Sequence, residues 1–371
     1  MSLRRKIEEE IQRQGPIPFS RYMEMCLYDP YLGYYAAHAQ QFGKAGDFYT
    51  SSDVHAVFGR LLARQFEEMW RALGAPAALQ IVELGPGRGL FAQDVLDWAE
   101  KKFPDFCAAV RYLLVEVSPA LRARLGETLQ RRLATGKGEI SDKLPAQLDT
   151  PAIIFANEFF DSLPVEVVSD RGEVRIGCDR GRLLESFVQP SAEALEYLDR
   201  YSVHPQTGER VEAARAAQEY MRSMAQRLHR GFVIVIDYGY TRDEQLAGRH
   251  LGTVTAFRHH TISASPYEAP GEQDITAHVN FSALQAAAEE GGLEPLALVT
   301  QAQFLMGIGE ANQFGDAFDD TCLPQEKAKV ALQLKHLVTP AGMGESFHVL
   351  VMSKGVDLAN VRRLSGLKFA H

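Results

Sequence analysis

The run Ile81-Val82-Glu83-Leu84-Gly85-Pro86-Gly87-Arg88-Gly89 decides the fold of this 371-residue chain. Its apolar first half predicts a buried strand over 79–84, and the spacing of apolar residues in 91–102 predicts a helix after it. Glycines at such a turn let the backbone approach a ligand without a Cβ in the way, and the helix offers its first amide groups to an anion. Strand-to-helix turns also carry glycine for geometry alone, so the run by itself remains a hypothesis of a ligand site.

The spacing of the three glycines separates two kinds of ligand. A dinucleotide fingerprint, G-x-G-x-x-G, requires its third glycine at position 90, where this chain has Leu90. The pattern here is G-x-G-x-G, which resembles the first motif of class I methyltransferases. The resemblance implies that S-adenosylmethionine is the cofactor and that Gly85, Gly87 and Gly89 bind it. A dehydrogenase is the weakest alternative.

Two glutamates at strand ends complete the predicted cofactor site. Glu83 lies near the carboxyl end of the first strand, where it could meet the ammonium group of the cofactor directly or through water. Glu116 lies at the end of the second strand, predicted over 112–117, and a carboxylate there can accept hydrogen bonds from both ribose hydroxyls. Ligands of open α/β sheets bind beyond the carboxyl ends of the strands, which is where both side chains fall. The alternative for Glu116 is an ordinary exposed carboxylate.

Short apolar strands alternate with helices around this site. Further strands are predicted over 152–156, 232–236, 296–300 and 347–353. Continuous apolar strands between helices indicate a parallel sheet covered on both faces, and therefore an α/β fold. Alternating residues in 165–188 predict a β-meander, which a helix over about 212–228 follows. We therefore expect an N-terminal helical and lid segment (1–75), a methyltransferase core (76–164 and 231–371) and an inserted substrate-side subdomain (165–230).

The composition limits the class of protein. A net charge of −9 does not suit a nucleic-acid clamp, because phosphate requires a basic face. The four cysteines lie far apart, without histidines at ligand spacing, which favours reduced thiols in a cytosol-like compartment. No apolar run is long enough to span a bilayer, and the acidic residues at 8–10 argue against a signal or transit peptide. We expect a cytoplasmic protein, or a mitochondrial matrix protein if eukaryotic, with no nucleic-acid or membrane partner.

Several motifs in the same order make nearly the whole chain similar to the MidA family. They are Leu27-Tyr28-Asp29-Pro30 with Gly33-Tyr34-Tyr35, Gly46-Asp47-Phe48-Tyr49-Thr50-Ser51, the glycine run, Ala156-Asn157-Glu158-Phe159-Phe160-Asp161, Asp237-Tyr238-Gly239 and residues 271–279. The mitochondrial member of that family is a protein arginine methyltransferase that assists the assembly of respiratory complex I. The resemblance therefore implies a partner protein that contains an arginine acceptor, with a respiratory-complex subunit as one candidate.

The same resemblance implies a fold and a lid. The fold is a Rossmann-like sheet with seven strands in the order 3-2-1-4-5-7-6, the last of them antiparallel. The lid is the segment in which Gly46, Asp47, Phe48 and Thr50 fold over the cofactor. Ser52-Asp53 stand where the family often has Pro-Glu, which implies that the lid is shifted rather than lost.

The loop after the fourth strand carries side chains suited to an arginine acceptor. A guanidinium is protonated at any ordinary pH, so a site must orient one nitrogen and balance the charge, which carboxylates do best. Glu158 is the first candidate for binding the guanidinium and Asp161 the second, although Asp161 could instead cap the following turn. Asn157 is expected to hold the cofactor or the loop. His278 could orient Glu158 or Asp274, although a lone histidine is more often structural.

Other interpretations remain open from the sequence. The acceptor could be a small molecule buried by the insertion, or the chain could be a non-catalytic assembly factor that binds the cofactor only for shape. Asp237, at the end of the fifth strand, could line the cleft or could be a structural partner of a backbone amide. Arg258-His259-His260 has no third ligand at useful spacing, which argues against a metal and favours an anion or substrate contact.

Overall fold

The computed structural model describes residues 2–37, 56–246, 250–258, 261–263, 265–318, 323–340 and 342–370. Within these residues the largest sheet has eight strands. Its seven longer strands lie side by side in the order β4 (Gly138–Ser141), β3 (Val110–Val115), β2 (Leu79–Leu84), β5 (Ala152–Asn157), β10 (Gly231–Tyr240), β16 (Phe347–Lys354) and β15 (Glu294–Thr300). Counted along the chain, this order is 3-2-1-4-5-7-6, as expected, and β16 is antiparallel to both neighbours. We expected seven strands, and the sheet has one more, because β14 (Val279–Asn280) pairs with the end of β10.

Helices cover both faces of this sheet. One face carries α5 (Ala56–Ala72), α6 (Leu90–Lys102), α7 (Pro104–Ala109), α8 (Pro119–Thr128), α9 (Gln130–Ala134), α14 (Gln301–Glu310) and α15 (Pro324–Val338). The other face carries α2 (Phe19–Tyr28), α11 (Arg215–Arg227) and α13 (Phe281–Glu290). Successive side chains of a strand point to opposite faces, so Ile153 and Phe155 pack with the first group and Ile154 with the second. The near-continuous apolar strands of the sequence follow from this double burial.

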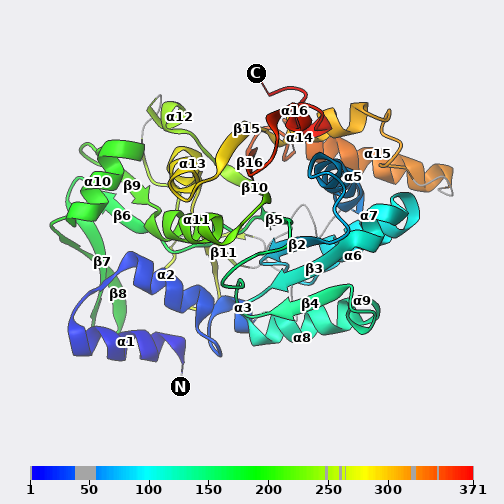
Figure 1. Cartoon of the computed structure of the whole chain (residues 1–371). Coiled ribbons are helices and arrows are strands. Elements are labelled where there is room, and N and C mark those ends of the chain that lie inside the picture. The colour runs from blue at the N-terminus through cyan, green and yellow to red at the C-terminus, as the bar shows by residue number, and fades with distance from the viewer. Residues whose placement is uncertain are drawn as a thin grey trace.

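A second sheet joins the insertion to the N-terminal segment. It contains β6 (Glu166–Ser169), β7 (Gly172–Asp179), β8 (Arg182–Val188) and β9 (Arg210–Ala213), together with β1 (Ile17–Pro18). The first three form the predicted antiparallel meander. The helix predicted over 212–228 is α11, which begins at Arg215 because 210–213 pair as β9 with β6. Figure 1 shows α1 (Leu3–Gln14) and α2 beside β7 and β8, on the far side of the molecule from α6, α7 and α15.

The remaining elements are short. A three-stranded sheet consists of β11 (Thr255–Arg258), β12 (Thr261–Ile262) and β13 (Asp274–Thr276), and it places β13 against α2. The others are α3 (Tyr34–Ala37), α10 (Ala192–Tyr201), α12 (Arg242–Leu246), α16 (Leu358–Val361) and the 3-10 helix η1 (Ser365–Leu367). Among the described helices, none is both long and apolar enough to cross a membrane.

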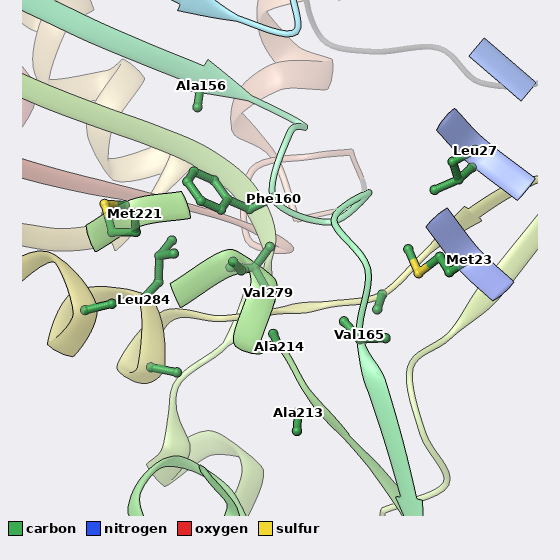
Figure 2. Close-up of a cluster of buried hydrophobic side chains, with 14 of the residues drawn as sticks. Met23, Leu27, Ala156, Phe160, Val165, Ala213, Ala214, Met221, Val279 and Leu284 are labelled. Atoms are coloured by element: carbon green, nitrogen blue, oxygen red, sulfur yellow. The ribbon is translucent and has the colours of Figure 1, made fainter. Parts of the chain in front are cut away.

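One apolar cluster fixes the turn that follows β5. Phe160 of this turn is 3% exposed and belongs to the same core cluster as Met23 of α2, Met221 of α11 and Leu284 of α13. Figure 2 shows the Phe160 ring among these side chains, near Met221 and Val279. The insertion, the N-terminal segment and the core all contribute to this cluster. The turn is therefore fixed in place, and with it the polar residues Glu158 and Asp161.

Candidate functional site

A cavity of about 450 Å³ lies at the carboxyl ends of β2, β3 and β5, and its size is typical of a small-molecule site. Its wall includes most of the predicted site residues: Glu83, Gly85, Gly87, Glu116, Asn157, Glu158 and Asp161. Gly89 and His278 lie outside the wall. The predicted lid residues Gly46, Asp47, Phe48 and Thr50, and also His259 and His260, lie outside the described residues.

The three glycines have different structural roles. All have positive φ, 61° at Gly85, 52° at Gly87 and 76° at Gly89, a region that other residues rarely adopt. A Cβ at Gly85 would lie 3.0 Å from the Phe159 ring, and one at Gly89 would lie 2.7 Å from Leu125. A Cβ at Gly87 would meet no described atom within 4 Å, and this glycine lines the cavity. Geometry therefore explains Gly85 and Gly89, and Gly87 leaves open space where a ligand can approach the backbone.

The two strand-end glutamates are buried carboxylates in the cavity wall. Glu116 is 6% exposed, so its alternative interpretation as an ordinary exposed carboxylate is wrong. The backbone N–H of Ser118 donates to Glu116 Oε1 at 2.8 Å, and burial raises the Glu116 pKa to about 7. Glu83 accepts a hydrogen bond of 2.8 Å from the Tyr112 hydroxyl on the neighbouring strand, and burial raises its pKa to about 8. Such strongly perturbed carboxyls in a cavity are typical of functional sites.

Asp237 holds the turn that presents Glu158. Its Oδ2 accepts hydrogen bonds from three consecutive backbone N–H groups, those of Phe159 (3.2 Å), Phe160 (3.0 Å) and Asp161 (3.3 Å). Glu158, directly before these amides, has a left-handed φ of 49°, which is unusual for a residue with a side chain and marks local strain. Asp237 is fully buried and does not line the cavity, so its structural interpretation is confirmed.

Three carboxylates of the cavity wall come from two segments of the chain. Glu158 and Asp161 come from the turn after β5, and Asp274 comes from β13. Asn157 Nδ2 donates to Glu158 Oε1 at 3.1 Å, and the Tyr35 hydroxyl donates to Asp274 Oδ1 at 3.3 Å. Within the described residues the whole wall contains seven carboxyl side chains and one arginine, so the cavity suits a cationic ligand.

The two carboxylate oxygens of Asp161 differ in their hydrogen bonds. Its side chain is 4% exposed, and the Tyr238 hydroxyl donates to Oδ2. Oδ1 is buried and accepts no hydrogen bond within the described part of the chain. Burial raises the pKa of Asp161, and the hydrogen bond from Tyr238 opposes that rise. A buried carboxylate oxygen without a donor is suited to a ligand N–H.

His278 and Tyr220 occupy positions that the sequence did not indicate. The His278 ring packs edge-on against Tyr238, with ring centroids 5.4 Å apart, so its described contact is neither Glu158 nor Asp274. Tyr220 of α11 lines the cavity and packs against Phe159 at 5.0 Å. Its position on a mostly apolar helix face gave no signal in the sequence, because only the packing of α11 brings it to the site.

Comparisons with known proteins agree with this geometry. Residues 61–299 match the sequence model of a family described as S-adenosyl-L-methionine-dependent methyltransferases. The mouse mitochondrial protein arginine methyltransferase NDUFAF7 is 30% identical over 375 residues, which cover 94% of this chain and 83% of the mouse protein. The homologue from Drosophila melanogaster is 29% identical over 400 residues, which cover 100% of this chain and 89% of that protein.

The solved structures agree with the sequence matches. A crystal structure from Burkholderia thailandensis with bound S-adenosyl-homocysteine has a TM-score of 0.82 at 29% identity and covers 99% of this chain and 95% of that one. A second structure from the same organism has a TM-score of 0.83 at 31% identity and covers 99% of this chain and 94% of that one. The chain therefore belongs to the MidA family of S-adenosylmethionine-dependent methyltransferases, and S-adenosylmethionine is its cofactor.

Proposed function

We propose that this enzyme methylates an arginine guanidinium of a partner protein, with Glu158 and Asp161 as the carboxylates that bind the acceptor. The proposal rests on the presence of three carboxylates, Glu158, Asp161 and Asp274, in the wall of one cavity. A guanidinium is a planar, permanent cation whose N–H fork pairs best with carboxylates. The names of the mouse and fly relatives, both protein arginine methyltransferases, support the same acceptor.

The cavity residues also fit the cofactor. We propose that Glu116 binds the ribose hydroxyls of the cofactor and that Glu83 binds its ammonium group. The cofactor would come closest to the backbone at Gly87, because no described atom lies within 4 Å of a Cβ built there. The shape of the glycine turn would depend on Gly85 and Gly89, and the cavity wall beside the cofactor would include Asn157. The proposed lid contacts remain Gly46, Asp47, Phe48 and Thr50. When bound, S-adenosylmethionine supplies a methyl group on a positively charged sulfur.

The acceptor residues then have three tasks. Glu158 accepts N–H groups of the guanidinium and fixes which nitrogen faces the methyl group, as positioning is the main requirement of such a displacement. Asp161 Oδ1 accepts a further N–H from the same cation. The nitrogen that gains the methyl group loses a proton, and an ionised Glu158 is placed to take it.

The acceptor side of the cavity involves the insertion. Tyr220 of α11 lines the wall, so we propose that 165–230 forms the substrate side and that 1–75 and the core complete the enzyme around it. A protein acceptor, with a respiratory-complex subunit as the candidate, is consistent with the mitochondrial relatives. A cytoplasmic or matrix location follows for this chain as a proposal.

The proposal is tested by transfer of labelled methyl groups. Purified enzyme is incubated with methyl-labelled S-adenosylmethionine and with an extract of a host strain that lacks the gene, and the proteins are then hydrolysed to amino acids. We expect label in methylated arginine. Label in another side chain, or only in small molecules, would reject arginine as the acceptor while leaving methyl transfer intact.

Cofactor affinity should depend on pH through Glu116. Because the pKa of Glu116 is about 7, this group takes up a proton as the pH falls from 8 to 6 and becomes a poorer acceptor for ribose hydroxyls. Titration calorimetry should therefore show weaker S-adenosylmethionine binding at pH 6 than at pH 8. Glu116→Gln should bind about tenfold more weakly at pH 8 and lose most of the dependence between pH 6 and 7.

Glu83→Gln is the matched control for this titration. It removes the group whose pKa is about 8 and leaves Glu116 in place, so the decrease between pH 7 and 6 should persist. Equal affinity of the unaltered enzyme at pH 6 and pH 8 would contradict the assignment of both carboxylates to the cofactor.

A further inference from the structure

Tyr238 lies behind the cavity wall, in contact with a residue of that wall. It belongs to β10, does not line the cavity, and its hydroxyl donates to Asp161 Oδ2. Asp161 lines the cavity, and its Oδ1 is buried without a donor in the described part of the chain. The hydroxyl of Tyr238 therefore occupies one oxygen of this carboxylate and leaves the other for a ligand.

The Tyr238 ring is itself held in place. His278 packs edge-on against it at 5.4 Å and Phe347 of β16 does so at 5.5 Å. The Tyr238 backbone N–H donates to Asp237 Oδ1 at 3.0 Å, which links it to the carboxylate that holds the turn of Glu158. The sheet and two neighbouring rings thus fix where the hydroxyl lies, and His278 acts on the ring rather than on the acids.

We propose that Tyr238 is a positioning residue for methyl transfer: its hydroxyl holds Asp161 in the rotamer that presents Oδ1 to the cationic acceptor. This inference rests on the proposed function, because it needs Asp161 to bind the acceptor. Tyr238 itself does not line the cavity, so it acts on the acceptor only through Asp161. Its partner, Asp161, precedes it by 77 residues, so the pair exists only through the fold.

The surroundings of Asp161 explain why one hydroxyl matters. Among the described residues, the ionisable groups around Asp161 are Glu158, Asp237, Asp274, Tyr28, Tyr35 and Tyr238. None of these is a cation, and burial already raises the Asp161 pKa. Without the Tyr238 hydroxyl, Asp161 Oδ2 would lose its side-chain donor, so the pKa of Asp161 would rise further. An acceptor cation binds the ionised form, so activity is lost at a higher pH when the hydroxyl is removed.

Tyr238→Phe tests the inference, because it removes the hydroxyl and keeps the ring between His278 and Phe347. With the extract assay, we expect kcat/KM for methyl transfer to fall about tenfold, and the acid limb of its pH profile to move up by about one pH unit. Affinity for S-adenosylmethionine should stay unchanged in calorimetry. The matched control is Tyr240→Phe, two residues along β10, whose hydroxyl accepts a hydrogen bond of 3.4 Å from Gln245 Nε2.

A double-mutant cycle separates positioning from general damage to the fold. If Tyr238 acts through Asp161, Tyr238→Phe should change kcat/KM less than about twofold in the Asp161→Asn background. The same tenfold loss in both backgrounds, or an acid limb that does not move, would overturn the inference. Absence of arginine methylation by the unaltered enzyme would instead reject the proposed function, so the two failures are distinguishable.

Discussion

Glu158→Gln is expected to lower the rate of methyl transfer about 100- to 1,000-fold and to leave S-adenosylmethionine affinity almost unchanged. The variant keeps the size of the side chain and an amide oxygen, but it loses the negative charge that balances a guanidinium and the group that can take its proton. Glu158 lines the cavity on the turn after β5, whereas the glycine turn follows β2 and Glu116 follows β3. The initial rate of label transfer into host-extract proteins measures the effect.

The control for this variant is Glu219→Gln. Glu219 is an exposed glutamate on α11, next to Tyr220, and it is not part of the cavity wall. The control should transfer methyl groups at the rate of the unaltered enzyme. If Glu158→Gln also does so while binding the cofactor, the catalytic assignment of Glu158 is wrong. A loss of cofactor binding in the same variant would place Glu158 in the cofactor site instead.

Asp237→Ala is expected to destabilise the protein by about 2–4 kcal/mol and to lower methyl transfer about 100-fold. It leaves the buried N–H groups of Phe159, Phe160 and Asp161 without their acceptor, and such unsatisfied donors carry the full cost of desolvation. The strained backbone of Glu158 then relaxes, so both acceptor carboxylates move. Urea denaturation measures the first effect, and the label-transfer assay measures the second.

Asp237→Asn gives a graded comparison. The asparagine side chain keeps one oxygen that can accept from the three amides. It replaces a carboxyl group whose pKa is raised by burial and by the neighbouring Asp161 and Glu158. We therefore expect a smaller loss of stability and partial activity. If Asp237→Ala has the stability and rate of the unaltered enzyme, these three hydrogen bonds do not hold the turn.

The features of the fold that depend on local patterns were predictable. Apolar strands between amphipathic helices predicted the covered parallel sheet, and the glycine run located its first turn. The two-residue strands β1 and β14 were not predicted, because their pairing with β7 and β10 depends on tertiary contacts. The start of α11 was wrong by three residues for the same reason, since 212–213 pair in β9.

The site was predictable where a residue lies at the carboxyl end of a strand or directly after it. Glu83, Glu116, Asn157 and Glu158 all fall at the cavity because the carboxyl ends of parallel strands share one edge of the sheet. The roles of Asp237, Tyr238 and His278 depend instead on distances between segments far apart in the chain. From the sequence we expected that His278 could orient Glu158 or Asp274. In the structure the His278 ring packs against Tyr238, and the Tyr238 hydroxyl donates to Asp161.

Arginine methylation by this enzyme is tested most directly by quantitative mass spectrometry of methylated arginines in the host proteome. Three strains are compared: one without the gene, one complemented with the unaltered gene, and one complemented with Glu158→Gln. We expect at least one methylarginine site that disappears without the gene, returns with the unaltered gene and stays absent with Glu158→Gln at equal protein level. Identical methylarginine profiles in the three strains would contradict this expectation.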